Sequence, residues 1–236
     1  MKKSILEIWA VTDKPHYLGH RKRLRERFIK SGASALHDYE LIELLLFGAK
    51  PRGDVKPLAK RLIETYGSFA DVVSADAKTL ALEVGLGEAA ICTLKVAQAA
   101  AEKLLQEQVM NKPVLSSWQM LLDYCRASMA YHGVEQFRVL YLNRKNVLIA
   151  DELQQRGTID HTPVYPREVI KRALELDASA LIMVHNHPSG DTTPSRSDIE
   201  VTKHIRDISR PLSIELHDHV IVGRKGFYSF KSTGLL

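Results

Sequence analysis

The sequence contains very little cysteine, and this scarcity excludes two common kinds of site. Only Cys92 and Cys125 occur among 236 residues, and they lie far apart and form no C-x-x-C pair. A disulfide framework needs several cysteines, and a thiolate zinc site needs closely spaced pairs of them. We therefore expect neither, and the low cysteine content favours a cytoplasmic protein.

Long hydrophobic runs are also missing. No apolar stretch approaches the roughly 20 residues that a membrane helix requires. The N-terminal segment MKKSILEIWAVTDK carries two lysines, but Glu7 interrupts its short apolar part. We therefore expect no signal peptide and no membrane partner. The chain is 45% hydrophobic and 26% charged, which is typical of a globular protein.

Negative charge is scarce at the beginning of the chain. Residues 1–30 carry nine Lys and Arg against three Asp and Glu, so they account for the whole net charge of +5. The cluster could contact the phosphates of a nucleic acid, or it could be the solvated face of a helix whose Leu24 and Phe28 point inward. The residues proposed for nucleic-acid contact here are Arg21, Lys22, Arg23 and Arg25.

The pattern of apolar and polar residues divides the chain into two domains. Residues 1–108 are predicted to form an all-helical domain, residues 109–116 a linker, and residues 117–236 an α/β domain. Expected helices lie at 38–48, 57–67, 88–107, 118–128, 166–176 and 193–208. Expected strands lie at 137–142, 147–149, 180–184, 213–222 and 227–230.

Two histidines and an aspartate carry the clearest chemical signal. His185 and His187 come just past a buried strand and are two residues apart, so their side chains project in similar directions. A loop with Pro188, Gly190 and Pro194 then leads to Asp198 in the first turn of a helix. Two imidazoles and one carboxylate leave one coordination position for water, which is the pattern of a catalytic zinc site.

A purely structural interpretation also exists for the end of this segment. Ser195 and Asp198 have the spacing of a helix-capping arrangement, and an acidic residue is favoured in the first turn of any helix. Paired histidines also occur by chance on surface loops. Each half of the pattern is therefore weak alone, and the two halves together favour a metal site.

At these positions the sequence resembles a known signature. His185, His187, Ser195 and Asp198 fit H-x-H-x7-S-x-x-D, the contiguous part of the JAMM (MPN-plus) metalloprotease motif. The likeness extends to the bacterial RadC family, in which a helical region precedes a JAMM-type domain. The segments that carry it are RERF at 25–28, DYELIELL at 38–45, VYPRE at 164–168 and HNHPSGD at 185–191.

The resemblance implies a fold, a cofactor and roles for matched residues. The fold would be a mixed sheet flanked by helices, with a cytidine-deaminase-like architecture. His185, His187 and Asp198 would hold one zinc ion, and Ser195 would hydrogen-bond the activated water or the oxyanion formed from substrate. The upstream Glu of the signature would act as general base, and Glu135 fits its place at the head of an early strand.

Two rivals for the general base remain in the sequence. Glu152 lies in the second expected strand, and Glu168 lies at the start of an expected helix, where an acid is favoured anyway. With any of these bases, zinc lowers the pKa of water toward ~7 and the resulting hydroxide attacks a polarised carbonyl. The reaction that the resemblance implies is amide hydrolysis of a protein or peptide.

A second pair of histidines could compete for the metal. Glu215, His217 and His219 would share one face of an expected strand, with Asp218 on the other face. They lack a loop or helix that would bring in a further ligand, so paired strand histidines that are merely hydrogen-bonded are the simpler interpretation. Asp218 could instead support a zinc-binding imidazole from behind.

The helical domain contains one further motif. Gly85 and Gly87 precede a helix and look like the turn of a helix-hairpin-helix, an element described in RadC proteins, whose backbone N–H groups approach a DNA phosphate. Ile91 stands where that pattern favours Ala, and Glu88 adds negative charge. A tight turn between packed helices explains the glycines equally well.

Two classes of function follow from the sequence. The first is a zinc-dependent metallohydrolase, specifically a metallopeptidase or isopeptidase. The alternative is a DNA-binding accessory protein in repair or recombination, in which the metal site is structural or vestigial. The sequence identifies neither the substrate nor the oligomeric state.

Overall fold

The computed structural model describes residues 19–157 and 164–236, with the side chains of Leu115 and Arg156 left aside. These residues form two compact units. The first comprises the described residues up to Val72 together with Ala81–Leu94. The second comprises Val73–Leu80 and Lys95–Leu236. None of the helices in the described part of the chain is long and apolar enough to cross a membrane.

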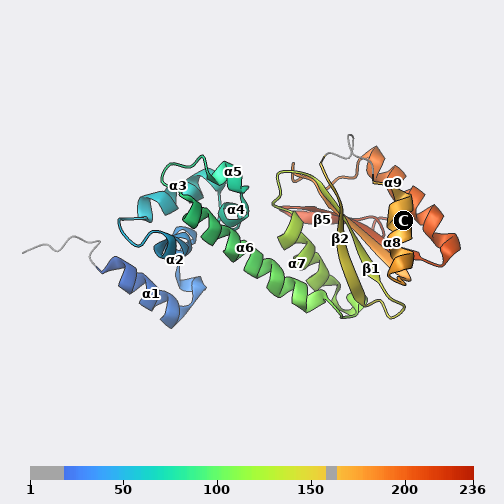
Figure 1. Cartoon of the computed structure of the whole chain (residues 1–236), viewed down its shortest axis with the longest axis horizontal. Coiled ribbons are helices and arrows are strands. Elements are labelled where there is room, and N and C mark those ends of the chain that lie inside the picture. The colour runs from blue at the N-terminus through green and yellow to red at the C-terminus, as the bar shows by residue number, and fades with distance from the viewer. Residues whose placement is uncertain (1–18, 158–163) are drawn as a thin grey trace, which may run out of the picture. The chain divides into compact units, whose positions relative to one another are not determined.

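The first unit is helical (Figure 1). Its elements are α1 (His20–Ser31), η1 (Ala33–Ala35), α2 (Asp38–Ala49), α3 (Lys56–Tyr66), most of α4 (Phe69–Ser74) and the start of α6 (Glu88–Val109). Helix α2 packs against both α1 and α3, and its apolar residues Ile42 and Leu46 are fully buried. Leu62 of α3 and Leu94 of α6 are also buried, at 0% exposure.

The second unit is an α/β domain. After α5 (Ala77–Leu80) and the rest of α6, it contains η2 (Val114–Ser117), α7 (Trp118–Met129), β1 (Gln136–Leu142), β2 (Leu148–Arg156), α8 (Pro166–Glu175), β3 (Ala180–Asn186), α9 (Arg196–Ser209), η3 (Arg210–Leu212), β4 (Glu215–Gly223) and β5 (Gly226–Ser229). A helical region followed by a mixed sheet with helices confirms the predicted fold class.

Among the described residues the strands form one mixed sheet in the order β2-β1-β3-β4-β5. Strand β1 pairs antiparallel with β2 and β3, β3 pairs parallel with β4, and β4 pairs antiparallel with β5. Helix α9 provides the crossover that a parallel pair requires. Helix α7 covers one face of the sheet, and α8 and α9 cover the other (Figure 1).

The central strand β3 explains the stability of this sheet. Every residue of β3 is buried, because Ile182 and Val184 face α7 while Leu181 and Met183 face α8 and α9. Burying such a side chain stabilises a fold by about 1.5–3 kcal/mol. A strand that is apolar on both faces is therefore fixed in place, and it presents the residues at its carboxyl end in a defined direction.

The segment predicted as a linker makes defined contacts with the second unit. Helix α6 continues to Val109. Met110 forms a bridge to Leu148, the first residue of β2, and Pro113 forms one to Val147 just before it. Val109 and Val114 are each 1% exposed and belong to the core between the sheet and α7. Residues 109–116 thus lie within the second unit as packed structure.

Candidate metal centre

The two histidines of the motif lie at the carboxyl end of β3. His185 is the second-last residue of the strand, not past its end as expected, and its side chain is fully buried on the α8–α9 side. His187 follows the strand, and its backbone N–H donates to the carbonyl of Val222 in β4 at 3.2 Å. The two side chains therefore point the same way, with their Nε2 atoms 3.0 Å apart.

The carboxylate of Asp198 faces these imidazoles from the first turn of α9. Its Oδ2 accepts hydrogen bonds from the backbone N–H of Ser195 at 2.7 Å and from the Ser195 hydroxyl at 2.6 Å. Its buried Oδ1 has no hydrogen-bond donor among the described residues and lies 3.2 Å from Nε2 of His185. One oxygen thus fixes the side chain, and the other is directed at the histidines.

The charge of Asp198 is stabilised despite its burial. Burial alone would raise the pKa of this carboxyl, but the adjoining imidazoles of His185 and His187, when they are protonated toward it, and the hydroxyl of Ser195 outweigh burial, so the pKa lies well below its ordinary value. Asp198 is therefore an anion at neutral pH, as a metal ligand must be.

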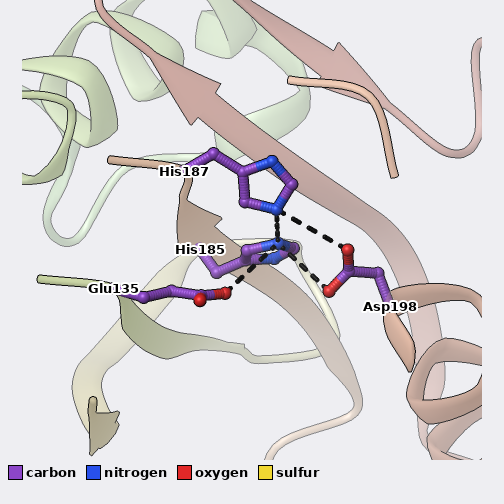
Figure 2. A group of neighbouring side chains, drawn as sticks. All are labelled: Glu135, His185, His187 and Asp198. Atoms are coloured by element: carbon purple, nitrogen blue, oxygen red, sulfur yellow. Dashed lines mark hydrogen bonds and ion pairs between the residues drawn. The ribbon is translucent and has the colours of Figure 1, made fainter. Parts of the chain in front are cut away.

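Glu135 approaches the same centre from the residue just before β1. Its Oε1 lies 4.0 Å from Nε2 of His185, and Figure 2 shows the four side chains converging from three separate segments of the chain. Asn186, buried between the two histidines on the opposite face of β3, holds this segment. Its Oδ1 accepts from the backbone N–H of Gln136 at 2.8 Å, and its Nδ2 lies 3.3 Å from the carbonyl of Val134.

The donor set fits a divalent cation. Glu135, His185, His187 and Asp198 each offer one ligand atom, and these atoms lie within 4.8 Å of one another. Two imidazoles with carboxylate oxygens are ligands that zinc accepts readily. A buried carboxylate oxygen without a donor is costly unless a cation or proton approaches it. Its orientation toward two imidazole nitrogens therefore favours a metal ion at this point.

The rival glutamates are engaged elsewhere. Glu152 in β2 forms an ion pair with Arg172 of α8 at 2.7 Å. Glu168 lies in the first turn of α8, where Arg167 donates to it at 3.0 Å. Among the described residues only one cluster of at least three His, Cys, Asp or Glu side chains could hold a metal, and it contains Glu135 rather than these two.

Ser195 takes the capping position that the structural interpretation of the sequence proposed. It is the N-cap of α9, and its Oγ accepts from the backbone N–H of Asp198 at 3.2 Å while donating to Oδ2 of the same residue. Capping and metal binding therefore do not exclude each other here, because they use different oxygens of Asp198. The hydroxyl lies at the edge of the cluster.

The second histidine pair is arranged differently from the expectation. The register of β4 against β3 shifts between Leu216 and Asp218, so Leu216 and His219 both face α8 and α9 although they are three residues apart. His217 contacts Asn146 at 2.6 Å, and His219 contacts His185 at 2.8 Å. The expectation that Glu215, His217 and His219 share one face is therefore wrong, and the competing metal cluster considered for them is not found among the described residues.

Asp218 also has a different role from the one considered for it. Its carboxylate accepts from the hydroxyl of Ser229 at 2.5 Å and from the backbone N–H groups of His219 and Lys231. These bonds tie β4 to β5 and to the turn that follows it. The imidazole that supports His185 from behind is His219, which sequence reasoning missed because a strand of ideal alternation contains no register shift.

The basic cluster of α1 is partly structural. The guanidinium of Arg21 donates to the carbonyls of Phe47, Lys50 and Gly53, and Lys22 forms an exposed ion pair with Glu26. Arg23 and Arg25 are exposed. Leu24 is buried as expected, but Phe28 is 40% exposed, so the inward-facing stripe of α1 is shorter than the sequence indicated.

The glycine turn before α6 is surrounded by cations that the local sequence does not contain. Gly85 has φ of 85°, which favours glycine, and Gly87 immediately precedes the helix. Lys50 donates to the carbonyl of Gly85 at 2.5 Å, and Arg61 donates to the carbonyl of Val84 at 2.5 Å. These residues are distant in sequence, so no local pattern could have revealed them.

Comparisons with known proteins agree with this architecture. Residues 115–235 match the family of the RadC-like JAB domain, and residues 16–92 match the UPF0758 N-terminal family. A UPF0758 protein of Rhodobacter capsulatus is 59% identical over 213 residues, which cover 90% of this chain and 100% of the relative. One of Ruegeria pomeroyi is 58% identical over 223 residues, which cover 94% and 100%. These matches confirm the resemblance seen in the motifs, and the chain belongs to the family of RadC-like JAB-domain proteins with a UPF0758 N-terminal region.

Proposed function

We propose that the protein is a zinc-dependent hydrolase that cleaves an amide bond in a protein or peptide. The observation that carries the proposal is the convergence of two imidazole nitrogens, the donor-free Oδ1 of Asp198 and the carboxylate of Glu135 at the end of β3. The membership of the JAB-domain family supports it, because the JAMM signature belongs to metalloproteases.

In this proposal His185, His187 and Asp198 hold the metal. A zinc ion in such a site supplies a Lewis acid and lowers the pKa of water toward ~7. Glu135 is placed at the margin of the cluster, where its carboxylate takes the proton of the attacking water and returns it to the departing amine. The carbonyl carbon gains the water oxygen, the C–N bond breaks, and the products are a carboxylate and an amine.

Ser195 would contribute a hydrogen bond in the same reaction. Its hydroxyl donates to Oδ2 of Asp198, next to the cluster. Rotation about its side chain would direct the hydroxyl at the oxyanion that develops on the substrate carbonyl, a contact that strengthens as charge forms.

Elemental analysis of the purified chain tests the metal site. We expect about one zinc per chain in the wild type and in His217→Ala, because His217 contacts Asn146 outside the cluster. Asp198→Ala should lose most of the metal, since it removes an anionic ligand. A wild type without metal, or a loss of metal with His217 instead, would contradict the proposal.

Hydrolysis of a peptide library, followed by mass spectrometry, tests the reaction. We expect cleavage that a chelator abolishes and that zinc restores. Glu135→Gln should keep the metal and lose roughly 10²–10⁴-fold in rate, which is the usual contribution of general acid–base catalysis. The matched control is Glu152→Gln, which removes a carboxylate paired with Arg172, away from the cluster. Equal activity of the Glu135 and Glu152 variants would refute the role given to Glu135.

DNA binding by the first unit is a second candidate function. The observation that favours it is the position of Lys50 and Arg61 at the Gly85 turn, which adds positive charge where backbone N–H groups at a helix start can meet a phosphate. The family resemblance includes such a turn.

Binding of a labelled duplex, measured by fluorescence anisotropy over a range of salt concentrations, tests this candidate. Affinity should fall steeply with salt, survive a chelator and weaken in a Lys50→Ala, Arg61→Ala double variant, with a smaller salt slope. The control is Lys103→Ala, a basic residue of the second unit. If the wild type fails to bind at low salt, this function is excluded.

A further inference from the structure

His219 lies directly behind the candidate metal centre. The ring is fully buried in β4, where it stacks on Phe230 with centroids 4.7 Å apart and meets the edge of Phe137 at 5.6 Å. Its Nε2 lies 2.8 Å from Nδ1 of His185, and its Nδ1 lies 2.6 Å from Oγ1 of Thr202 in α9. Both ring nitrogens are thus in hydrogen bonds, and the ring has no freedom to turn.

The hydroxyl of Thr202 determines the direction of these bonds. Its Oγ1 lies 2.5 Å from the backbone carbonyl of Asp198, one helical turn earlier. A carbonyl can only accept, so the single hydroxyl proton of Thr202 is donated to it. Two oxygens at this distance without a proton between them would repel strongly. Thr202 therefore accepts from Nδ1–H of His219.

The rest of the proton positions follow from that assignment. A fully buried imidazole between aromatic rings is neutral, because a charge there would be desolvated without a counter-ion in contact. A neutral ring that carries its proton on Nδ1 presents a lone pair at Nε2. His185 must then donate Nδ1–H to His219, which leaves the lone pair of His185 on Nε2. That nitrogen faces His187, Asp198 and Glu135.

We propose that Thr202 and His219 are positioning residues that fix the tautomer and ring orientation of His185, so that its Nε2 lone pair is presented to the metal. The chain of bonds runs from the carbonyl of Asp198 through the Thr202 hydroxyl and the His219 ring to His185. Since it begins on the backbone of one metal ligand and ends on another, it couples α9, β4 and β3 at the centre. The inference rests on the metal site of the proposed function but not on the hydrolytic reaction.

The tautomer of His187 is fixed by a single contact with the backbone. Its Nδ1 lies 2.7 Å from the backbone carbonyl of Asp191, which can only accept, so Nδ1 carries a proton, and Nε2 carries the lone pair when the ring is neutral. One imidazole is therefore set by the adjacent loop, and the other is set by two buried side chains. Partners of this kind commonly contribute 10–100-fold to metal affinity.

Two substitutions at Thr202 separate the hydroxyl from the shape of the side chain. Thr202→Val keeps the branched shape and removes the hydroxyl, which leaves Nδ1–H of buried His219 without an acceptor. The His219 ring is then more stable with its proton on Nε2, where it can donate to Nδ1 of His185. His185 must in turn carry its own proton on Nε2, toward the metal. Thr202→Ser keeps the hydroxyl and should behave as the wild type.

Zinc affinity of the full-length chain, measured by competition with a chromophoric chelator, gives the first result. We expect Thr202→Val to bind zinc roughly 10–100-fold more weakly than the wild type and Thr202→Ser to bind within a few-fold of it. Thermal unfolding of the metal-free variants shows that each chain is folded. If Thr202→Val binds zinc as tightly as the wild type, the inference is overturned.

Nitrogen-15 spectra of the imidazoles in the metal-free chain give a second and independent result. We expect His185 and His219 to carry their protons on Nδ1 in the wild type and in Thr202→Ser, and on Nε2 in Thr202→Val. A wild-type His185 protonated on Nε2 alone would overturn the inference. If the wild type binds no zinc, the proposed function fails, and these spectra still decide whether the chain of bonds sets the tautomer.

Discussion

At the scale of single residues, Glu40 shows how a partner reverses the effect of burial. The side chain is buried at the start of α2, where it forms an ion pair with Arg27 and accepts from the backbone N–H of His37 at 3.0 Å. Burial raises the pKa of this carboxyl, but the contacts with Arg27 and His37 outweigh it, so the pKa lies below its ordinary value of 4.5. A group with a lowered pKa stabilises the fold above its unfolded pKa and loses that stabilisation as the pH falls.

We predict that Glu40→Gln lowers the free energy of unfolding by about 1 kcal/mol at neutral pH, since one partner of the ion pair is half exposed and screened. The difference from the wild type should shrink below pH 4.5 and vanish once Glu40 of the folded wild type is protonated. Urea unfolding at several pH values measures it. Glu26→Gln, which removes only an exposed pair with Lys22, should change little. If Glu40→Gln remains less stable than the wild type in acid, the charge of Glu40 is not the cause of the difference.

The predictability of the site also differs from residue to residue. His185, His187, Ser195 and Asp198 could be found from the sequence because a short loop and one helical turn join them, so their spacing alone brings them together. Glu135 arrives from another strand, and only the resemblance to a known signature separated it from Glu152 and Glu168. Thr202 could not be found, because its role depends on a ring that a register shift in β4 turns toward it.

At the scale of elements, the end of β4 is built to receive the loop that follows β3. A Cβ added to Gly223 would lie 2.8 Å from the carbonyl oxygen of Gly190 and 2.9 Å from Cγ2 of Thr192. The first contact is with backbone, which cannot move aside as a flexible side chain can. The loop carries the carbonyl of Asp191 that orients His187. Close packing of this loop on β4 therefore helps to set the geometry of the metal centre.

We predict that Gly223→Ala displaces the loop, lowers the free energy of unfolding by about 1–3 kcal/mol as overpacking does, and weakens zinc binding. Gly226→Ala is the matched control, because it lies in the next strand and a Cβ there would meet nothing within 4 Å. Denaturant unfolding and zinc competition measure the two effects. Zinc affinity that is unchanged in Gly223→Ala would mean that the loop does not control His187.

The elements themselves were largely predictable from the periodicity of apolar residues. Strand β3 stands out as a continuous apolar run, and its burial on both faces follows from that run. The neighbours of each element were less predictable, since pairing depends on contacts between distant segments. Of the two cations at the Gly85 turn, Lys50 follows α2 and Arg61 lies in α3. No sequence pattern near residue 85 predicts either contact.

At the scale of the whole molecule, α6 contributes to both compact units. Beyond its end, the backbone N–H of Asn111 donates to the carbonyl of Leu148 at 3.1 Å, and that of Val114 donates to Asn146 at 2.8 Å. Val109 and Val114 add apolar surface to the core beneath α7. A boundary drawn from composition alone, at residue 117, would remove these contributions from the α/β domain.

We predict that a chain beginning at Lys95 is more stable than one beginning at Trp118. Two buried valines and their neighbouring backbone hydrogen bonds should make a difference of more than about 3 kcal/mol in the free energy of unfolding. Urea unfolding of the two fragments measures it. In the longer fragment, Val109→Ala should lower the free energy of unfolding by part of this difference, because Val109 is buried. Lys103→Ala, at an exposed position, should not lower it. If the two fragments are equally stable, residues 95–117 contribute nothing to the stability of the α/β domain.

The pairing of β3 with β1 on one side and β4 on the other has a consequence for how the protein folds. Glu135 and His219 reach the histidines of β3 through pairings between segments that are far apart in the sequence, and topologies rich in such contacts fold slowly. A metal ion would therefore find the complete centre, with Glu135 and the supporting ring of His219 in place, only in the folded sheet. Zinc would then lower the unfolding rate of the protein without raising its folding rate, because the ion stabilises the native state and not the transition state.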